Sequence, residues 1–267
     1  MMNEGGSVAG EMRANMVLQG IRHSQTYGRG KNEYAIEIDG LDLVVWSGET
    51  LGILGAKRDG INTVADIMCG SLSPSSGHIY ESGQVINLSP STEFLADESL
   101  RVNLQRVARA RQVNGASLRG LIDVVVDEAH AGGVIDEIVD DIDSLTVARC
   151  QIFMALATGI RLLIIEDAES ISEAFRDERV ESKLHGFRRR GGSIVLLSRD
   201  VNFLARTSDR IAWFRKSEIL MDAPARQIPI WYNQLTKAER SKEKAKAGQI
   251  LRRIRAQFGP AAIRVVK

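Results

Sequence analysis

Residues 48–69 read GETLGILGAKRDGINTVADIMC, and this stretch decides the fold. The apolar run 50–54 is typical of a buried strand, and a loop with two glycines follows it. Val64, Ile67 and Met68 then recur at the spacing of one helix face. A strand, a glycine-bearing loop and a helix in this order form the layout of a phosphate-binding turn.

The segments around this turn alternate between strand and helix patterns. Apolar and polar side chains alternate over residues 34–45, which predicts antiparallel strand pairing with one buried face. Three continuous apolar runs predict strands that are buried on both faces: 161–165, 193–197 and 210–214. Because helical patterns separate these runs, we predict an α/β protein with a largely parallel sheet.

The composition is that of an ordinary globular protein. Of 267 residues, 44% are hydrophobic and 26% are charged, which excludes disordered, collagen-like and disulfide-scaffold proteins. Cys69 and Cys150 lie in apolar contexts and predict buried thiols in a reducing compartment. No apolar run reaches the length of a membrane span, and the first residues lack a secretory signal. We therefore expect a soluble cytoplasmic protein, without a metal site because its four histidines are scattered.

The glycine-bearing loop fits the frame of a Walker A motif, G-x-x-x-x-G-K-[ST], but lacks its functional side chains. Gly55 and Gly60 take the two glycine positions. Ile61 stands at the lysine position, and Asn62, followed by Thr63, stands at the position of the Mg²⁺-binding hydroxyl. An isoleucine cannot neutralise charge on the β- and γ-phosphates. On these residues alone, an ordinary strand-to-helix turn remains an alternative.

Six segments, in matching order and spacing, resemble the ATP-binding subunits of bacterial polysaccharide exporters of the capsule, O-antigen and teichoic-acid type. They are 48–55, 69–79, Phe94 with Asn103, 145–158, 162–167 and 194–200. The resemblance implies an ABC-type P-loop nucleotide-binding domain, with a mixed sheet core, an antiparallel β subdomain and an α-helical subdomain at about 95–158. It divides the chain into a disordered or frayed N-terminus at 1–15, the ABC domain at 16–227 and a basic C-terminal extension at 228–267.

The resemblance also implies where the catalytic carboxylates and the γ-phosphate sensor stand, each in altered form. Glu166-Asp167 replaces the Asp-Glu that ends Walker B, so the metal ligand and the base are exchanged. Arg199 stands at the switch-histidine position, and an arginine, which stays protonated, cannot serve as a neutral acceptor. The loop 87–97, where the family has its Q-loop, contains no glutamine, and Glu93 is a poor substitute.

Three further site positions follow from the resemblance. Tyr27 matches the aromatic residue that stacks on adenine, with a surface loop tyrosine as an equal alternative. Thr146 and Val147 match the serine and glycine of the ABC signature. The threonine retains a hydrogen-bond donor, whereas the valine side chain crowds a backbone that must approach the γ-phosphate.

These replacements together predict a catalytically degenerate ABC ATPase-like subunit, a pseudo-ATPase, because phosphoryl transfer depends on positioning and electrostatics. Mg-ATP binding is expected to be weak, and no other cofactor is expected. The resemblance implies two partners, a second ATP-binding subunit, in a homodimer or heterodimer, and an ABC permease. It places this protein in the cytoplasm, peripherally on the inner face of the plasma membrane. The alternatives are a non-enzymatic regulatory or scaffolding protein, and a slow ATPase that uses Glu166 and Asp167 in exchanged roles.

The net charge of +1 hides two unlike parts. Residues 237–267 hold ten Lys and Arg against two Glu, which leaves −7 on the rest of the chain, with acidic residues concentrated in 123–143. This basic tail favours helix, and it is either a solvated helix or a segment that contacts an anionic membrane surface. No nucleic acid partner is expected, because no aromatic residues are interleaved with the basic ones.

Overall fold

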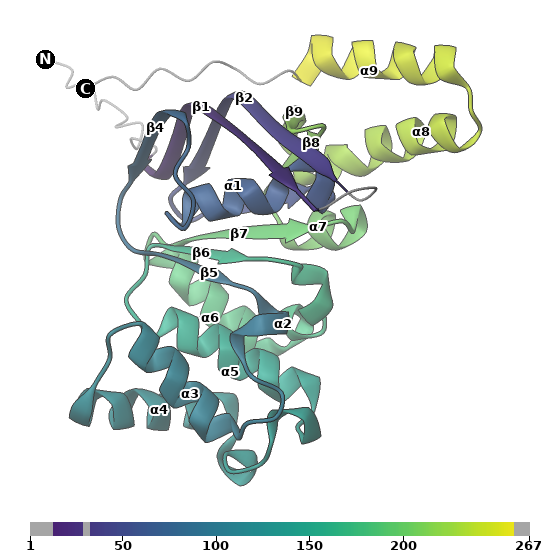
Figure 1. Ribbon diagram of the computed structural model, residues 1–267. Coiled ribbons are helices and arrows are strands. Elements are labelled where there is room, and N and C mark those ends of the chain that lie inside the picture. The colour runs from purple at the N-terminus through teal and green to yellow at the C-terminus, as the bar shows by residue number, and fades with distance from the viewer. Residues whose placement is uncertain (1–12, 29–32, 259–267) are drawn as a thin grey trace, which may run out of the picture.

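The computed structural model describes residues 13–28 and 33–258. Two sheets, the helices around them and a C-terminal helical hairpin make up this part of the chain (Figure 1). The sequence predicts a disordered or frayed N-terminus at 1–15, and residues 1–12 of this range lie outside the described residues. Ala14 and Asn15 already belong to the first strand, so the expectation is wrong for these two residues.

A six-stranded sheet forms the centre of the fold, in the order β5-β6-β7-β3-β8-β9. All neighbours are parallel except β8 and β9. The strands are β3 (Thr50–Leu54), β5 (Val85–Leu88), β6 (Leu162–Ile165), β7 (Ser193–Ser198), β8 (Arg210–Arg215) and β9 (Glu218–Pro224). Every residue of β3, β6 and β7 is buried. The strands predicted from continuous apolar runs are thus confirmed, and so is a largely parallel sheet.

A smaller antiparallel sheet covers one face of the central sheet, with helix α1 (Ile61–Met68) between them (Figure 1). Its strands, in the order β2-β1-β4, are β1 (Ala14–Tyr27), β2 (Tyr34–Trp46) and β4 (Ser76–Glu81). Ile36, Ile38 and Leu41 of β2 point into the core shared with α1, as the alternating pattern predicts. The helix that follows the glycine-bearing loop is therefore held on both sides.

Helices cover the opposite face of the central sheet. The chain leaves β5 through the short α2 (Pro90–Glu93) and forms α3 (Leu100–Ala110), α4 (Gly115–Ala129) and α5 (Ser144–Leu156), within the range expected for the helical subdomain. α6 (Glu178–Arg189) and α7 (Val201–Thr207) follow β6 and β7. These helices share one large core with the sheet, in which Leu104, Phe153 and Leu196 are buried.

The two thiols differ in their surroundings. Cys150 on α5 is fully buried, and this burial raises the pKa of its thiol to about 12. Cys69, at the end of α1, is only half-buried. The expectation of two buried thiols is therefore confirmed for Cys150 and wrong for Cys69.

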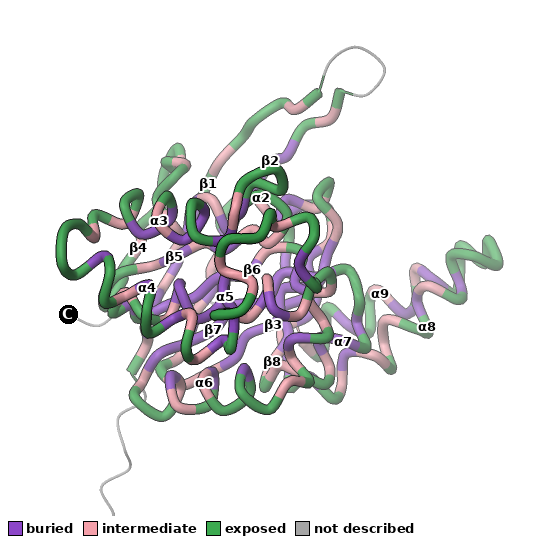
Figure 2. The backbone as a smooth tube through the Cα atoms, turned by 90° about the horizontal axis from the view of Figure 1, so that it is seen from below, coloured by how far each residue is buried: buried purple, intermediate pink, exposed green. Residues whose placement is uncertain are grey.

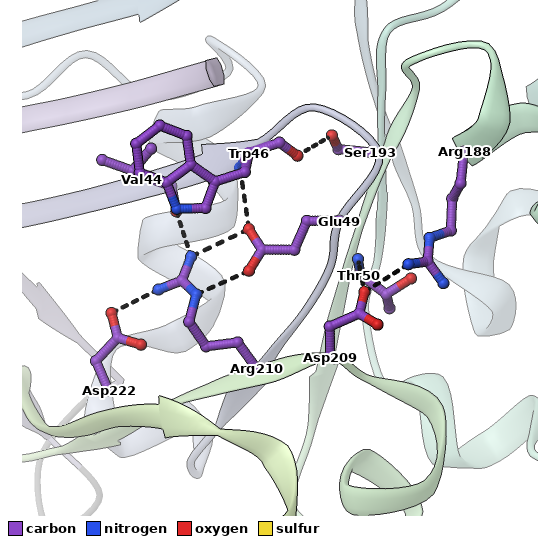
Figure 3. Close-up of polar contacts among 9 residues, drawn as sticks. All are labelled: Val44, Trp46, Glu49, Thr50, Arg188, Ser193, Asp209, Arg210 and Asp222. Atoms are coloured by element: carbon purple, nitrogen blue, oxygen red, sulfur yellow. Dashed lines mark hydrogen bonds and ion pairs between the residues drawn. The ribbon is translucent and has the colours of Figure 1, made fainter. Parts of the chain in front are cut away.

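A charge network fastens the small sheet to the central one (Figure 3). Arg210 of β8 donates to Oε1 of Glu49 at 2.7 Å, to Oδ2 of Asp222 at 2.5 Å and to the carbonyl oxygen of Val44 at 2.6 Å. Burial alone would lower the pKa of Arg210, but the hydrogen bonds and charges of the two carboxylates outweigh it and raise that pKa. Because Glu49 directly precedes β3, the network also positions the strand that leads into the glycine-bearing loop.

The basic C-terminal extension is folded. α8 (Ile228–Arg240) and α9 (Lys244–Phe258) form a hairpin in which α9 packs against α8 and β9 (Figure 1). Ile250 is 7% exposed and Ile254 is fully buried, so the apolar stripe of this extension packs against the body while its basic residues are exposed. The tail residues 259–267 lie outside the described residues. No helix in the described part of the chain is long and apolar enough to cross a membrane.

Candidate functional site

The glycine-bearing loop joins β3, in the middle of the central sheet, to α1. Gly60 has φ +86°, a left-handed conformation that favours glycine. A Cβ atom on Gly55 would lie 2.8 Å from Cγ2 of Ile61, closer than packed atoms approach. Both glycines are therefore required by the shape of the loop itself, whether or not it holds a phosphate.

The loop contains a carboxylate that the sequence analysis did not single out. Asp59 accepts the backbone N–H of Ala56 through Oδ2 and that of Lys216 through Oδ1, each at 2.9 Å. The N–H of Gly55 donates to the carbonyl oxygen of Ser198 at 3.2 Å. The N–H groups of Gly55 and Ala56, the first two residues of the loop, are thus bound to acceptors of the protein.

Glu166 is held by two side-chain amides. Nδ2 of Asn62 donates to its Oε2 at 2.8 Å, and Nδ2 of Asn87 donates to its Oε1 at 2.6 Å. Asn62 lies in the first turn of α1, Asn87 on β5 and Glu166 directly after β6, so we call these three residues the amide latch. Asn87 was not found from the sequence, because nothing in its local pattern marks it.

The residues after Glu166 bring a further acid into the site. Asp167 has a left-handed φ of +49° and begins a short turn that contains Glu169. Oε1 of Glu169 accepts the backbone N–H of Arg199 at 3.2 Å and lies 3.7 Å from its Nε. The arginine side chain is 72% exposed. The guanidinium of Arg199 is thus held only loosely, at an exposed position.

Three of the predicted motif positions meet at one pocket of about 430 Å³. The loop after β3, the segment after β6 and the end of β7 all contribute to its wall. The residues that line it are Gly55, Ala56, Lys57, Arg58, Ile61, Asn62, Asp167, Glu169, Leu197, Ser198 and Arg199. Ile61 is only 4% exposed, so at the lysine position this wall is apolar and packed.

Tyr27 is not among the residues that line the pocket. Its hydroxyl lies 3.1 Å from Oγ1 of Thr63, and its ring stacks on Tyr34 at 5.7 Å between centroids. The guanidinium of Arg58 lies over the ring of Tyr34 at 5.3 Å. The side chain expected to stack on adenine therefore takes part in a column of side chains beside α1.

Thr146 and Val147 lie at the start of α5, away from the pocket wall. Asp143 caps this helix by accepting the N–H of Thr146 at 2.9 Å. The hydrogen bonds from the side chain and backbone of Thr146 hold the pKa of Asp143 below its usual value. Thr146 is 8% exposed and Val147 packs partly against the core, so in a single chain both residues serve the packing of α5.

Glu93 is not among the residues that line the pocket either. It pairs with Arg111 at 2.6 Å beside the helical subdomain. Burial raises the pKa of Glu93, although the charges of Arg111 and Arg106 act in the opposite direction. Among residues 13–28 and 33–258, no group of three or more His, Cys, Asp or Glu side chains could hold a metal ion.

Comparison with solved structures shows the fold. The chain matches cbiO1 from Clostridium perfringens, described as part of an ABC transporter complex, with a TM-score of 0.62 and 14% identity over 87% of this chain and 97% of that one. A dimeric ATP-binding cassette with ADP and Pi bound matches with a TM-score of 0.62 and 15% identity over 79% of this chain and 98% of that one. The protein has the ABC ATPase P-loop fold, with its mixed sheet, antiparallel β subdomain and helical layer.

Distant sequence relatives are export ATP-binding proteins, and no family model matches the chain. The teichoic acids export ATP-binding protein TagH of Listeria innocua serovar 6a is 22% identical over 193 residues, which cover 72% of this chain and 58% of the relative. The O-antigen export system ATP-binding protein RfbB of Myxococcus xanthus is 26% identical over 65% of this chain and 40% of the relative. The chain thus spans about half the length of these relatives.

Proposed function

We propose that this protein is a catalytically degenerate ABC ATPase-like subunit of a polysaccharide export transporter. The distant relatives named for teichoic acid and O-antigen export support the transporter type. The observation that carries the degeneracy is the amide latch, in which Asn62 and Asn87 donate to both oxygens of Glu166.

The latch does not fit a magnesium ion. In P-loop ATPases, Mg²⁺ is held by a hydroxyl of the loop and a Walker B carboxylate, both of which present oxygen to the metal. Here Asn62, at the hydroxyl position, presents an N–H donor toward Glu166. Each oxygen of Glu166 already accepts a charge-assisted hydrogen bond, and Asn62, at the hydroxyl position, adds no oxygen ligand in this arrangement.

The loop is equally poorly suited to the phosphates. Asp59 places a negative charge against the loop backbone, where the phosphate chain of a nucleotide would need donors. Ile61 supplies no charge, and it is packed against Gly55 rather than open to solvent. Three cations, Lys57, Arg58 and Arg199, do line the pocket, but none of them stands at the lysine position, and Arg58 lies over the ring of Tyr34.

Such a subunit would act through its contacts. We infer that it pairs with a second ATP-binding subunit and docks on an ABC permease at the inner face of the membrane. A heterodimer with an intact partner would retain catalytic competence in the other subunit. The alternative, a regulatory or scaffolding protein without a permease, is separated by copurification of a permease and an intact ATPase from the native cell.

The test of degeneracy is ATP hydrolysis by the purified protein with Mg²⁺, compared with the variants Glu166→Gln and Asp167→Asn. We expect all three proteins to release phosphate at the same background rate. Turnover by the wild type that either substitution abolishes would contradict the proposal and establish the slow ATPase that uses these carboxylates. Equilibrium binding of a fluorescent ATP analogue, with Mg²⁺ and with EDTA, shows separately whether nucleotide binds.

A further inference from the structure

We propose that the α8–α9 hairpin binds an anionic phospholipid surface through its exposed basic side chains. α9 carries five basic residues and no acidic one: Lys244, Lys246, Arg252, Arg253 and Arg255. Lys237 and Arg240 in the last turns of α8, and Lys242 in the connecting turn, extend the cluster. All eight side chains are exposed. We call them the basic surface.

Most of this charge is not used by the fold. The two acids of the hairpin are engaged, Glu239 with Arg215 and Glu243 with Lys246. Arg255 lies 3.3 Å from Glu218, in a pair that is about two-thirds exposed on both sides. In the described part of the chain, no hydrogen bond or ion pair holds the side chains of the remaining members, Lys237, Arg240, Lys242, Lys244, Arg252 and Arg253.

Two of the lysines lie at the start of α9, next to the positive end of the helix dipole. Glu243 directly precedes this turn, and its carbonyl oxygen accepts the N–H of Ala247. The Glu243 side chain pairs with Lys246 and offsets one of the two lysine charges. Lys244 has no such partner in the described part of the chain, so its charge is available to an anionic ligand.

The hairpin that carries this surface extends outward from the body. In both views it projects beyond the sheets, with the turn between α8 and α9 outermost (Figures 1 and 2). The apolar face of α9, formed by Ala247, Ile250 and Ile254, is buried against the rest of the protein. The helix thus has no free apolar face to insert, so its attachment would be peripheral, electrostatic and sensitive to salt.

The aromatic residues of the hairpin favour a lipid surface over a nucleic acid. Trp231 packs edge-on against Phe258 at 5.9 Å, and Tyr232 packs against Trp213 at 5.2 Å. They lie where the hairpin joins the body and none is interleaved with the basic residues, whereas single-stranded nucleic acids are bound by stacking on aromatics within a basic groove. An array of Lys and Arg without aromatics suits phosphate-rich headgroups, to which each nearby basic residue adds attraction.

The test is cosedimentation of the full chain with vesicles of phosphatidylcholine, with and without phosphatidylglycerol. The test variant combines Lys244→Gln, Arg252→Gln and Arg253→Gln, which keep helix propensity and break no ion pair. The control combines Arg109→Gln, Arg119→Gln and Arg189→Gln, three exposed cations on other helices with the same change in net charge. Far-ultraviolet circular dichroism verifies that both variants are folded.

We expect the wild type and the control to bind only the anionic vesicles at low salt and to dissociate at high salt, where the Debye length shrinks from about 10 Å at 0.1 M to about 3 Å at 1 M. The test variant should bind about a hundredfold more weakly. Lack of wild-type binding, or equal loss in the control, would overturn the proposal. Binding of a single-stranded oligonucleotide that the test variant loses, without vesicle binding, would replace it with a nucleic-acid site. None of the substituted residues lines the pocket beside α1. The lipid-binding proposal can therefore fail while the proposal of a degenerate ATPase stands, and the reverse.

Discussion

The side-chain amide of Asn62 donates a hydrogen bond of 2.8 Å to Oε2 of Glu166. Asn87 holds the other oxygen of the same carboxylate at 2.6 Å. The first turn of α1, strand β5 and the end of β6 are thereby joined at one point. A carboxylate that would bind a metal in an active relative of this fold serves here as an acceptor for two amides, which supports a structural role for it.

Removing the latch should cost stability. Asn62→Ala is expected to lower the free energy of unfolding by about 1.5–3 kcal/mol, because a charged acceptor loses one of its two donors. Urea denaturation followed by circular dichroism measures the change. Asn233→Ala, on the exposed face of α8, is the control and should change stability by no more than about 0.5 kcal/mol. Equal effects of the two substitutions would show that the latch contributes nothing.

The shape of the loop depends on the contact between Gly55 and Ile61. Gly55→Ala would place a Cβ atom 2.8 Å from Cγ2 of Ile61, and we expect a loss of about 1–3 kcal/mol. In the double variant with Ile61→Ala the clash with the isoleucine disappears. The double variant should therefore lose less free energy of unfolding than the two single variants lose together. Gly120→Ala, which meets open space on α4, should be neutral or slightly stabilising. Strict additivity at Gly55 and Ile61 would contradict the packing described.

The network around Arg210 should be among the most sensitive polar sites. Arg210→Ala leaves Glu49 and Asp222 without their cation, and we expect a loss of about 3–5 kcal/mol in the free energy of unfolding. Arg22→Ala removes an ion pair whose two side chains are 65% and 81% exposed, and should cost less than about 1 kcal/mol. Thermal unfolding of the two variants measures the difference. Equally small shifts of the unfolding midpoint in Arg210→Ala and Arg22→Ala would show that the network around Arg210 is dispensable.

Asp177 should make stability depend on pH. Its ion pair with Arg149, aided by the backbone N–H groups of Val180 and Arg179, holds the pKa of the carboxyl below its usual value. The unfolded chain then binds the proton more tightly, so the stabilising contribution is present above pH about 4 and is lost as the pH falls further.

Asp177→Asn should therefore destabilise the protein by about 1–3 kcal/mol at pH 7 and by much less near pH 3. Urea denaturation at the two pH values measures the difference. Asp39→Asn, on an 81% exposed side chain, should have a small effect at both. A penalty for Asp177→Asn that does not change with pH would mean that the loss comes from packing rather than from charge.

The sequence by itself determined the buried strands at the centre of the sheet and the turn from strand to helix that follows β3. Continuous apolar runs predict β6, β7 and β8, because a strand that is covered on both faces carries apolar side chains on both of them. The glycines of the loop and the isoleucine at its lysine position are likewise identified from the sequence alone. Such patterns are local, since periodicity and turn chemistry act over a few residues.

The tertiary structure alone decided which side chains meet. Asn87 and Glu166 are 79 residues apart, and they bond because β5 and β6 lie side by side in the sheet. Asp59 reaches the N–H of Lys216 across 157 residues for a similar reason, because the loop after β3 lies beside the end of β8. No local pattern specifies the order of strands. The role of a carboxylate in this fold, as metal ligand or as hydrogen-bond acceptor, is therefore decided by the neighbours that strand order brings to it.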